Sequence, residues 1–388
     1  MFITILEKYQ KKIKVNIICF LFAFYIFFWG ISFNFIQLRF LFLLLIIPIL
    51  LSFSKIYFIK IFKYSIIPII LLSHLAFQAS VLTLHHLFSV LGLYVIFIIL
   101  DVYKKFFFSN LNRIIYFFLF AFFFFLVVQF FSYDNFFKQV SGDCIGCFSI
   151  LRVFFKENSH LALIAPSTIF YLLFISNSHK FFNYFLAFIF FIICAINSSL
   201  TLIIGIIFLI SLLFCLKVKF SNSQKTFLII LFFFILIKFI TSSETKIKVL
   251  DFFTENSSVN LSTEVYKKSF LVAKKALFHK PLGYGFNNYS EAFEQFALSF
   301  DVSNKEVYLL NNKDASNNLS KIVTEFGVFS IFYIFFLIYF FFSKKIDVYN
   351  KIFLLLPILI QTFVRGAGYF NGGFLLFFFY CIYSLLKK

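Results

Sequence analysis

Charged residues are scarce in this chain, and arginine and the acidic residues are the scarcest among them. Only 13% of the 388 residues are charged, with 16 Asp and Glu in total and 4 Arg against 31 Lys. Hydrophobic residues make up 62% of the chain, which contains 72 Phe. Soluble proteins average about 45–50% apolar residues, so a soluble fold could not bury this much apolar surface. The excess of Phe and Lys is typical of an AT-rich genome, so each Arg requires an explanation.

Several signals for small-molecule chemistry are also missing. The six Cys are scattered, and no second Cys or His pair lies near Cys144 and Cys147 to complete a zinc site, although a local disulfide between these two stays open. The turn Pro281–Asn288, PLGYGFNN, has the spacing of neither a P-loop nor a dinucleotide fingerprint. The sequence therefore predicts no metal and no cofactor.

Long apolar runs are what the chain has in abundance. A helix needs about 20 apolar residues to cross the hydrocarbon of a bilayer. Twelve segments, some of them short, meet this need, at about 15–33, 38–53, 64–82, 87–103, 114–132, 160–176, 181–196, 198–216, 226–241, 319–342, 350–365 and 373–386. The tight pairs at 181–216 and 350–386 could instead be re-entrant. The basic N-terminus precedes an apolar run without a small-residue cleavage site, which predicts an uncleaved first span. The pattern predicts an all-α polytopic membrane protein with about 12 transmembrane helices.

The distribution of basic residues predicts the orientation of these helices. Connections expected on one side carry 19 Lys and Arg against three acidic residues, whereas the long segments 133–158 and 242–318 are each neutral. Lys and Arg are retained in cytoplasmic loops, so both termini are predicted to lie in the cytoplasm and the two neutral segments outside it. This topology accounts for the net charge of +19 without a nucleic-acid partner.

The first candidate site is the stretch from Arg152 to His160, RVFFKENSH, where segment 133–158 meets the sixth expected span. Its Arg and Lys could bind a phosphate, because both offer cationic donors. Glu157 or His160 could accept a proton from a sugar hydroxyl. The alternative is an ordinary polar helix start with a capping Asn or Ser and solvated charges.

Two further candidates lie within expected spans. Arg365 occurs in QTFVRGAGYFNGG, at the outer end of the eleventh span. Ionisable groups at membrane depth are costly and usually face a cavity or a partner, although Arg365 could also snorkel to the headgroups. Glu325 lies four residues after Lys321, hence on the same helical face. This pair could be a structural ion pair, or it could orient a basic group or the acceptor sugar. His85 is predicted to be a packing or interfacial residue.

The order of several short motifs carries a family resemblance. The motifs are FFKENSH (154–160), INSSLT (196–201), PLGYGFNNY (281–289) and SNNLSKIVTEFG (316–327). This succession resembles the O-antigen polymerase family and the related O-antigen ligases of bacterial envelopes, over roughly residues 115–375. The ligases look like His-Asn followed, after nine residues, by Gly. Here Ser316-Asn317 precedes Gly327, so the His is absent and polymerase is favoured. The Arg that the family often shows ahead of PLGYG is also absent, with Lys267 and Lys268 in that region.

The resemblance implies a metal-independent glycosyl transfer at the periplasmic face of the bacterial inner membrane, within lipopolysaccharide biosynthesis. The growing glycan would leave undecaprenyl diphosphate and join a hydroxyl of a newly flipped lipid-linked repeat unit. A chain-length regulator and a flippase are candidate partners. Cations would neutralise the charge that the diphosphate gains as it leaves. The residues predicted to bind substrate or diphosphate are Arg152, Lys321, Arg365 and Asn317. The catalytic candidates are Glu157, His160 and Glu325.

In these terms the chain divides into three parts. Residues 1–241 hold spans 1–9 with a short periplasmic loop at about 133–158, residues 242–318 form a large periplasmic loop, and residues 319–388 hold spans 10–12. Two alternatives stay open. One is an O-antigen ligase that transfers the glycan to lipid A-core. The other is a lipid-linked oligosaccharide flippase, which would have little use for an outward loop of this length.

Overall fold

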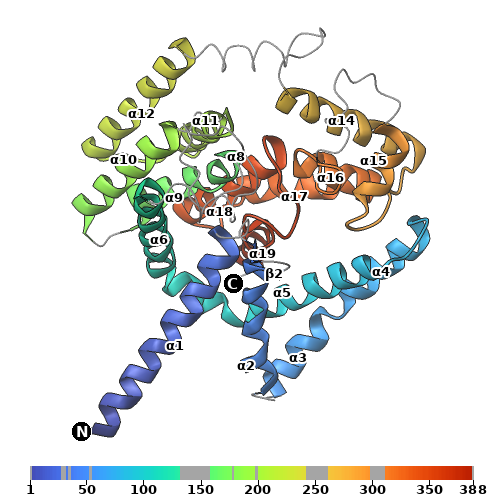
Figure 1. The fold of residues 1–388 in the computed structure, drawn as a ribbon, viewed down its shortest axis with the longest axis horizontal. Coiled ribbons are helices and arrows are strands. Elements are labelled where there is room, and N and C mark those ends of the chain that lie inside the picture. Colours follow the sequence, from blue (N-terminus) through green and yellow to red (C-terminus); the bar gives the residue numbers. More distant parts are fainter. Residues whose placement is uncertain are drawn as a thin grey trace.

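A computed structural model describes residues 2–27, 32–33, 36–51, 55–131, 158–176, 179–196, 200–241, 261–297 and 311–386. Helices dominate these ranges (Figure 1). The β structure within them is a single antiparallel pair of two-residue strands, Ser32–Phe33 (β1) and Ile36–Gln37 (β2). The predicted all-α class is thus confirmed for the described part of the chain. Arg152, Glu157, Cys144 and Cys147 lie outside it.

The N-terminal third is a series of apolar helices. They are α1 (Phe2–Phe27), the 3-10 helix η1 (Leu38–Leu45) continued by α2 (Ile46–Leu51), α3 (Lys55–Tyr64), α4 (Ile66–Gln78), α5 (Leu84–Ser109) and α6 (Leu111–Phe131). Such runs of Ile, Leu and Phe become helical in an apolar environment because a helix satisfies its own backbone hydrogen bonds. α1 packs against η1 and α6, and α5 packs against α3 and α4.

The remaining helices include short, broken ones. They are α8 (Asn158–Ala162), α9 (Ala165–Phe170), the π-helix η2 (Tyr171–Ile175), α10 (Lys180–Ile196), α11 (Leu200–Cys215), α12 (Asn222–Thr241), α14 (Leu261–His279), α15 (Tyr289–Ala297), α16 (Asn318–Phe326), the 3-10 helix η4 (Gly327–Phe329), α17 (Ser330–Phe342), α18 (Val348–Phe363) and α19 (Phe374–Leu386). Pro166 lies in the first turn of α9, where its missing N–H costs no hydrogen bond, and this accounts for the break after α8.

Among the residues that the structure describes, four helical stretches are long and apolar enough to cross a membrane. They are Ile61–Gln78, Leu84–Ser109, Leu111–Val128 and Asn318–Phe342. Six shorter apolar helices accompany them in the described residues: Phe40–Leu51, His160–Ile175, Lys180–Cys194, Leu200–Cys215, Val348–Phe363 and Phe374–Leu386. These features are consistent with an all-α membrane protein. Helical segments overlap every range expected from the sequence, but the count of twelve crossings stays a prediction.

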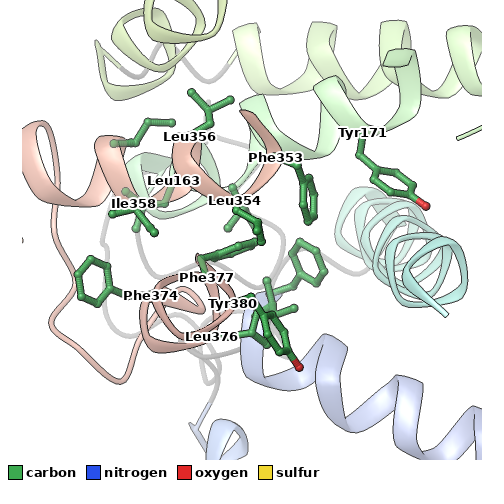
Figure 2. Close-up of a cluster of buried hydrophobic side chains, with 14 of the residues drawn as sticks. Leu163, Tyr171, Phe353, Leu354, Leu356, Ile358, Phe374, Leu376, Phe377 and Tyr380 are labelled. Carbon is green, nitrogen blue, oxygen red and sulfur yellow. The ribbon is translucent and has the colours of Figure 1, made fainter. Parts of the chain in front are cut away.

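The core forms around α18, which is buried on nearly all sides from Lys351 to Thr362. Figure 2 shows Phe353 and Leu354 of α18 beside Phe377 of α19, and the rings of Phe353 and Phe377 meet edge to face at 5.8 Å. α18 also packs on α9 and α11. A helix that is apolar all round and buried all round is typical of the centre of a bundle.

Polar contacts tie together connections that the sequence places on the cytoplasmic side. Lys104 forms an ion pair with Asp101 at 2.7 Å and lies over the ring of Tyr383 near the end of α19. Gln224, at the start of α12, donates to the carbonyl of Leu173 in η2 at 2.8 Å. Connections predicted on one side are therefore neighbours in space, as a membrane topology requires. The connections predicted on the other side meet in the candidate site.

Candidate functional site

The candidate site is built on α16. The side-chain oxygen of Asn317 accepts a hydrogen bond from the backbone N–H of Ser320 at 2.8 Å, which caps the first turn of the helix. One turn further on, Lys321 and Glu325 lie on the same face with their charged atoms 3.7 Å apart. Both side chains have 0% exposure. A buried pair of this kind must be held by further hydrogen bonds, because removing two charges from water is costly.

The glycine-rich turn closes the other end of α16. Its backbone N–H groups at Tyr284 and Gly285 donate to the carbonyls of Thr324 and Glu325 at 3.0 and 2.9 Å, which satisfies groups that a helix end leaves unpaired. Gly283 and Gly327 both have positive φ angles. A Cβ atom on Gly327 would lie 1.9 Å from the carbonyl oxygen of Pro281, and one on Gly283 would lie 2.2 Å from that of Glu325. PLGYG and EFG therefore form one interlocked unit that only glycine permits.

The turn also delivers hydrogen-bond donors to the Glu325 carboxylate. The backbone N–H of Asn287 donates at 2.8 Å to one oxygen, and that of Tyr289 at 3.2 Å to the other. The Tyr369 hydroxyl, from the connection between α18 and α19, donates at 2.7 Å. Burial, together with the charge of Glu325, raises the pKa of Tyr369 well above its usual value, so this phenol stays a donor. Both oxygens of the Glu325 carboxylate are thus engaged by groups inside the protein.

Lys321 is held just as completely. Its ammonium donates to the side-chain oxygen of Asn287 at 3.0 Å, to the carbonyl of Lys313 at 2.7 Å and to a carboxylate oxygen of Asp314 at 3.1 Å. These three acceptors match the three protons that a lysine ammonium can donate. The Asp314 side chain is 48% exposed, whereas Lys321 has no exposed surface. The buried Lys321 is therefore linked to the surface of the site by its ion pair with the partly exposed Asp314.

The orientation of the Asn287 amide determines the state of His85. Lys321 can only donate, so the amide oxygen of Asn287 faces it and the amide nitrogen faces the opposite way. This nitrogen donates to the Ser89 hydroxyl at 2.9 Å and lies 3.0 Å from Nε2 of His85. Nε2 must then be an acceptor, which places the proton of the neutral His85 ring on Nδ1. His85 is exposed at the start of α5, so a buried lysine sets the tautomer of a histidine at the surface.

Arg365 joins the site through close backbone packing. The N–H of the next residue, Gly366, donates to the carbonyl of Ser316 at 2.8 Å, immediately before α16. A Cβ atom on Gly366 would lie 2.5 Å from the side-chain oxygen of Asn318, and one on Gly368 would lie 2.3 Å from the Asp314 carboxylate. The glycines near Arg365 therefore allow segment 365–369 to lie directly on segment 311–318. Arg365 itself is partly exposed.

The structure brings together four of the seven residues predicted from the sequence. Lys321, Glu325 and Asn317 meet on α16, and Arg365 lies beside them. His160 is buried on α8, which packs on α9 and α11. The remaining two, Arg152 and Glu157, lie outside the described residues. The functional roles assigned to all seven stay predictions.

Sequence reasoning missed the exposed part of the site. No sequence signal points to Asp314, Asn287 or Tyr369 as site residues, and His85 is predicted only as a packing or interfacial residue. The sequence does contain a signal for the conformation of Asn287, because an Asn at the end of a glycine-rich turn is a residue that tolerates positive φ; the structure gives it a φ of 58°. No local pattern connects His85 with it, because the two residues are 202 positions apart.

The exposed edge of the site combines cations with groups that bind hydroxyls. Lys313 and Arg365 offer positive charge, Asp314 offers an acceptor and His85 offers an N–H donor. No cluster of three or more His, Cys, Asp or Glu side chains suited to a metal occurs among the described residues. No family model, curated protein or solved structure matches the chain. The functional argument therefore rests on this geometry together with the order of the short motifs in the sequence.

Proposed function

We propose that the chain is an O-antigen polymerase, a glycosyltransferase that joins undecaprenyl-diphosphate-linked oligosaccharide repeat units at the periplasmic face of the inner membrane. One observation carries this proposal. Segments 279–291, 311–318 and 365–369 and the start of α5, all expected on the outward side, converge on the buried Lys321–Glu325 pair. Their convergence gathers cations, a carboxylate and an imidazole at the end of candidate membrane helices, where a lipid-anchored diphosphate would arrive.

The proposed chemistry divides between exposed and buried residues. Arg365 and Lys313 neutralise the charge that the diphosphate gains as the glycan departs, together with Arg152 from segment 133–158. Asp314 accepts a hydrogen bond from the acceptor hydroxyl and takes its proton as the new glycosidic bond forms and the bond to the diphosphate breaks. His85 donates a hydrogen bond to a substrate oxygen. The buried Lys321, Glu325 and Asn317 keep these groups in place. A diphosphate is already a good leaving group, so orientation and charge neutralisation supply most of what the transfer needs.

The proposed topology places both termini in the cytoplasm of a multi-pass inner-membrane protein. Its support is the excess of Lys and Arg in alternate connections, which matches cytoplasmic retention of basic residues. Contacts between connections also agree with it: on one side Lys104 lies over the ring of Tyr383, and on the other Lys280 donates to the carbonyl of Gln78. Reporter fusions after residues 241 and 297 test it, since a cytosolic signal from segment 242–318 would rule out a periplasmic site.

The function is tested by the lipopolysaccharide ladder of a strain that lacks the gene. Loss of a polymerase leaves a single repeat on the core, and the restored gene should return long chains. Arg365→Ala should fail to do so while the protein stays in the membrane. Arg113→Ala provides the matched control, because Arg113 is an exposed arginine at the predicted cytoplasmic end of α6.

Two outcomes would overturn the assignment. A ladder of normal lengths from Arg365→Ala would remove Arg365 from the site. A deletion strain whose core carries no repeat at all would rule out the polymerase in favour of the ligase or the flippase, since either of these is needed to attach even the first repeat.

A further inference from the structure

Helix α14 has one face packed into the protein. Its buried residues Val265, Ser269, Val272 and Ala276 recur at helical spacing. Val272 and Ala276 pack with Tyr284 and other side chains of the segment around α15 in a small apolar cluster of their own. α14 contacts both α15 and α16, and Figure 1 shows these three helices grouped at one side of the molecule. This face fully accounts for the attachment of α14 to the candidate site.

The opposite face of α14 is apolar and basic at once. Phe270, Leu271 and Phe278 are 39%, 43% and 77% exposed, respectively. Lys267, Lys274 and Lys275 lie on the same side of the helix by their spacing. α14 carries four Lys and one Glu, and three of these Lys lie on this face, whereas Lys268 is buried against the ring of Phe293. Three large apolar side chains exposed on one helical face form a contiguous patch, and such patches mark surfaces that bind a protein or a membrane.

The exposed apolar surface continues from α14 to a candidate membrane span. Leu282, just after α14, is 47% exposed, and its carbonyl lies 2.9 Å from the His74 ring near the end of α4. Val328 is 50% exposed, and its N–H donates to the carbonyl of Pro281. From there the exposed Phe332 leads along α17, within the apolar stretch Asn318–Phe342. The apolar face of α14 is thus continuous with a surface suited to lipid.

We propose that α14 is an interfacial helix that lies in the headgroup layer of the same membrane that the apolar helices cross. Phe270, Leu271 and Phe278 insert among the outermost acyl carbons. The lysines extend along this face so that their ammonium groups reach anionic lipid phosphates, as amphipathic side chains do at an interface. The glycine-rich turn, which caps the end of α16, follows directly after α14. A helix α14 fixed at the bilayer surface therefore also fixes the position of this turn. This inference does not depend on the proposed enzymatic function.

The chain permits a direct test because it contains a single tryptophan, Trp29. With Trp29→Phe as the background, Phe270→Trp and Phe278→Trp each provide one fluorescent reporter on the exposed face of α14. Glu294→Trp provides the matched control, on an exposed polar position of α15. The full-length protein is reconstituted in vesicles of phosphatidylcholine and phosphatidylglycerol. Two brominated lipids serve as quenchers within the membrane, one with bromine near the headgroup end of the acyl chain and one with bromine near its terminus. Iodide serves as the quencher in water.

The α14 reporters should be quenched most by bromine near the headgroups, and iodide should quench them roughly twofold less than the Glu294→Trp control. Adding Lys274→Glu should weaken the bromine quenching in vesicles rich in phosphatidylglycerol. Reporters as open to iodide as the control, and insensitive to bromine, would overturn the proposal. Shielding from iodide without bromine quenching would also overturn it, because a protein would then cover α14. If Trp29→Phe fails to fold, the same reporters are measured with Trp29 retained and its signal subtracted.

Discussion

Replacing Lys321 by methionine tests whether the buried ion pair holds the site together. Methionine has a similar length but no charge, so Lys321→Met removes three hydrogen bonds and leaves the Glu325 carboxylate buried. At 3.7 Å the Lys321–Glu325 attraction amounts to about 4–5 kcal/mol for an effective dielectric constant of about 20. Glu325 keeps its hydrogen bonds from Asn287, Tyr289 and Tyr369, which offset part of the loss.

The expected loss of stability is about 3–5 kcal/mol, as when one partner of a buried pair is removed. At about 2 °C per kcal/mol for a large chain, the melting temperature should fall by about 6–10 °C. A thiol-reactive dye can follow unfolding of the purified protein in detergent. Cys19, Cys194 and Cys381 are buried and become accessible when the protein unfolds, whereas the exposed Cys215 reacts already in the folded state and sets the baseline. The double variant Lys321→Met, Glu325→Gln should recover part of the loss, since no uncompensated charge is left.

Lys280→Met provides the control that separates burial from distance. Lys280 lies closer to its partner Glu291, at 3.0 Å, but the two side chains are 27% and 22% exposed. A partly solvated pair contributes about 1 kcal/mol or less, so this variant should melt within about 2 °C of the wild type. If Lys280→Met lowered the melting temperature as much as Lys321→Met, burial could not be what makes the Lys321 pair important.

Three further predictions concern other parts of the same region. Gly327→Ala should destabilise the protein by more than about 1 kcal/mol, because φ is +54° and the added carbon would lie 1.9 Å from the carbonyl oxygen of Pro281. In the control Gly92→Ala, in α5, the added carbon meets only Phe370 at 3.8 Å. This control should be neutral or stabilising in the same melting assay. Nitrogen NMR of histidine-labelled protein should show His85 as a neutral ring with its proton on Nδ1. The His85 signal is identified as the one that is missing in His85→Gln. A proton on Nε2 would contradict the orientation of the Asn287 amide. Burial tends to raise the pKa of Glu291, but hydrogen bonds from Asn288, Ser80 and Lys280 and the charge of Lys280 hold it below its ordinary value of 4.5. Its stabilising effect should therefore be fully present above about pH 4.5 and be lost as the pH falls through the lowered pKa, so that the melting temperatures of wild type and Glu291→Gln converge in acid; a constant difference would argue against this cause.

Local patterns in the sequence were sufficient to predict the helices and the pairing within α16. Apolar runs determine where an apolar solvent makes a helix, so helical segments overlap all the expected ranges. The spacing of four between Lys321 and Glu325 places both on one face in any helix. These properties depend only on neighbours along the chain, so they need no knowledge of the tertiary fold.

Only the tertiary structure decided which groups surround that pair. Asn287, Tyr369 and His85 reach the site from other elements, and the hydrogen bonds that bind them span 38, 44 and 202 positions, respectively. No periodicity in the sequence encodes such contacts, because they arise from how the glycine-rich turn lies on the end of α16. The same packing buries one face of α14, including Lys268, and leaves Phe270, Phe278, Lys274 and Lys275 exposed. The physical reason is that a residue's own segment sets its helical face, whereas its burial and its partners are set by the segments that pack against it.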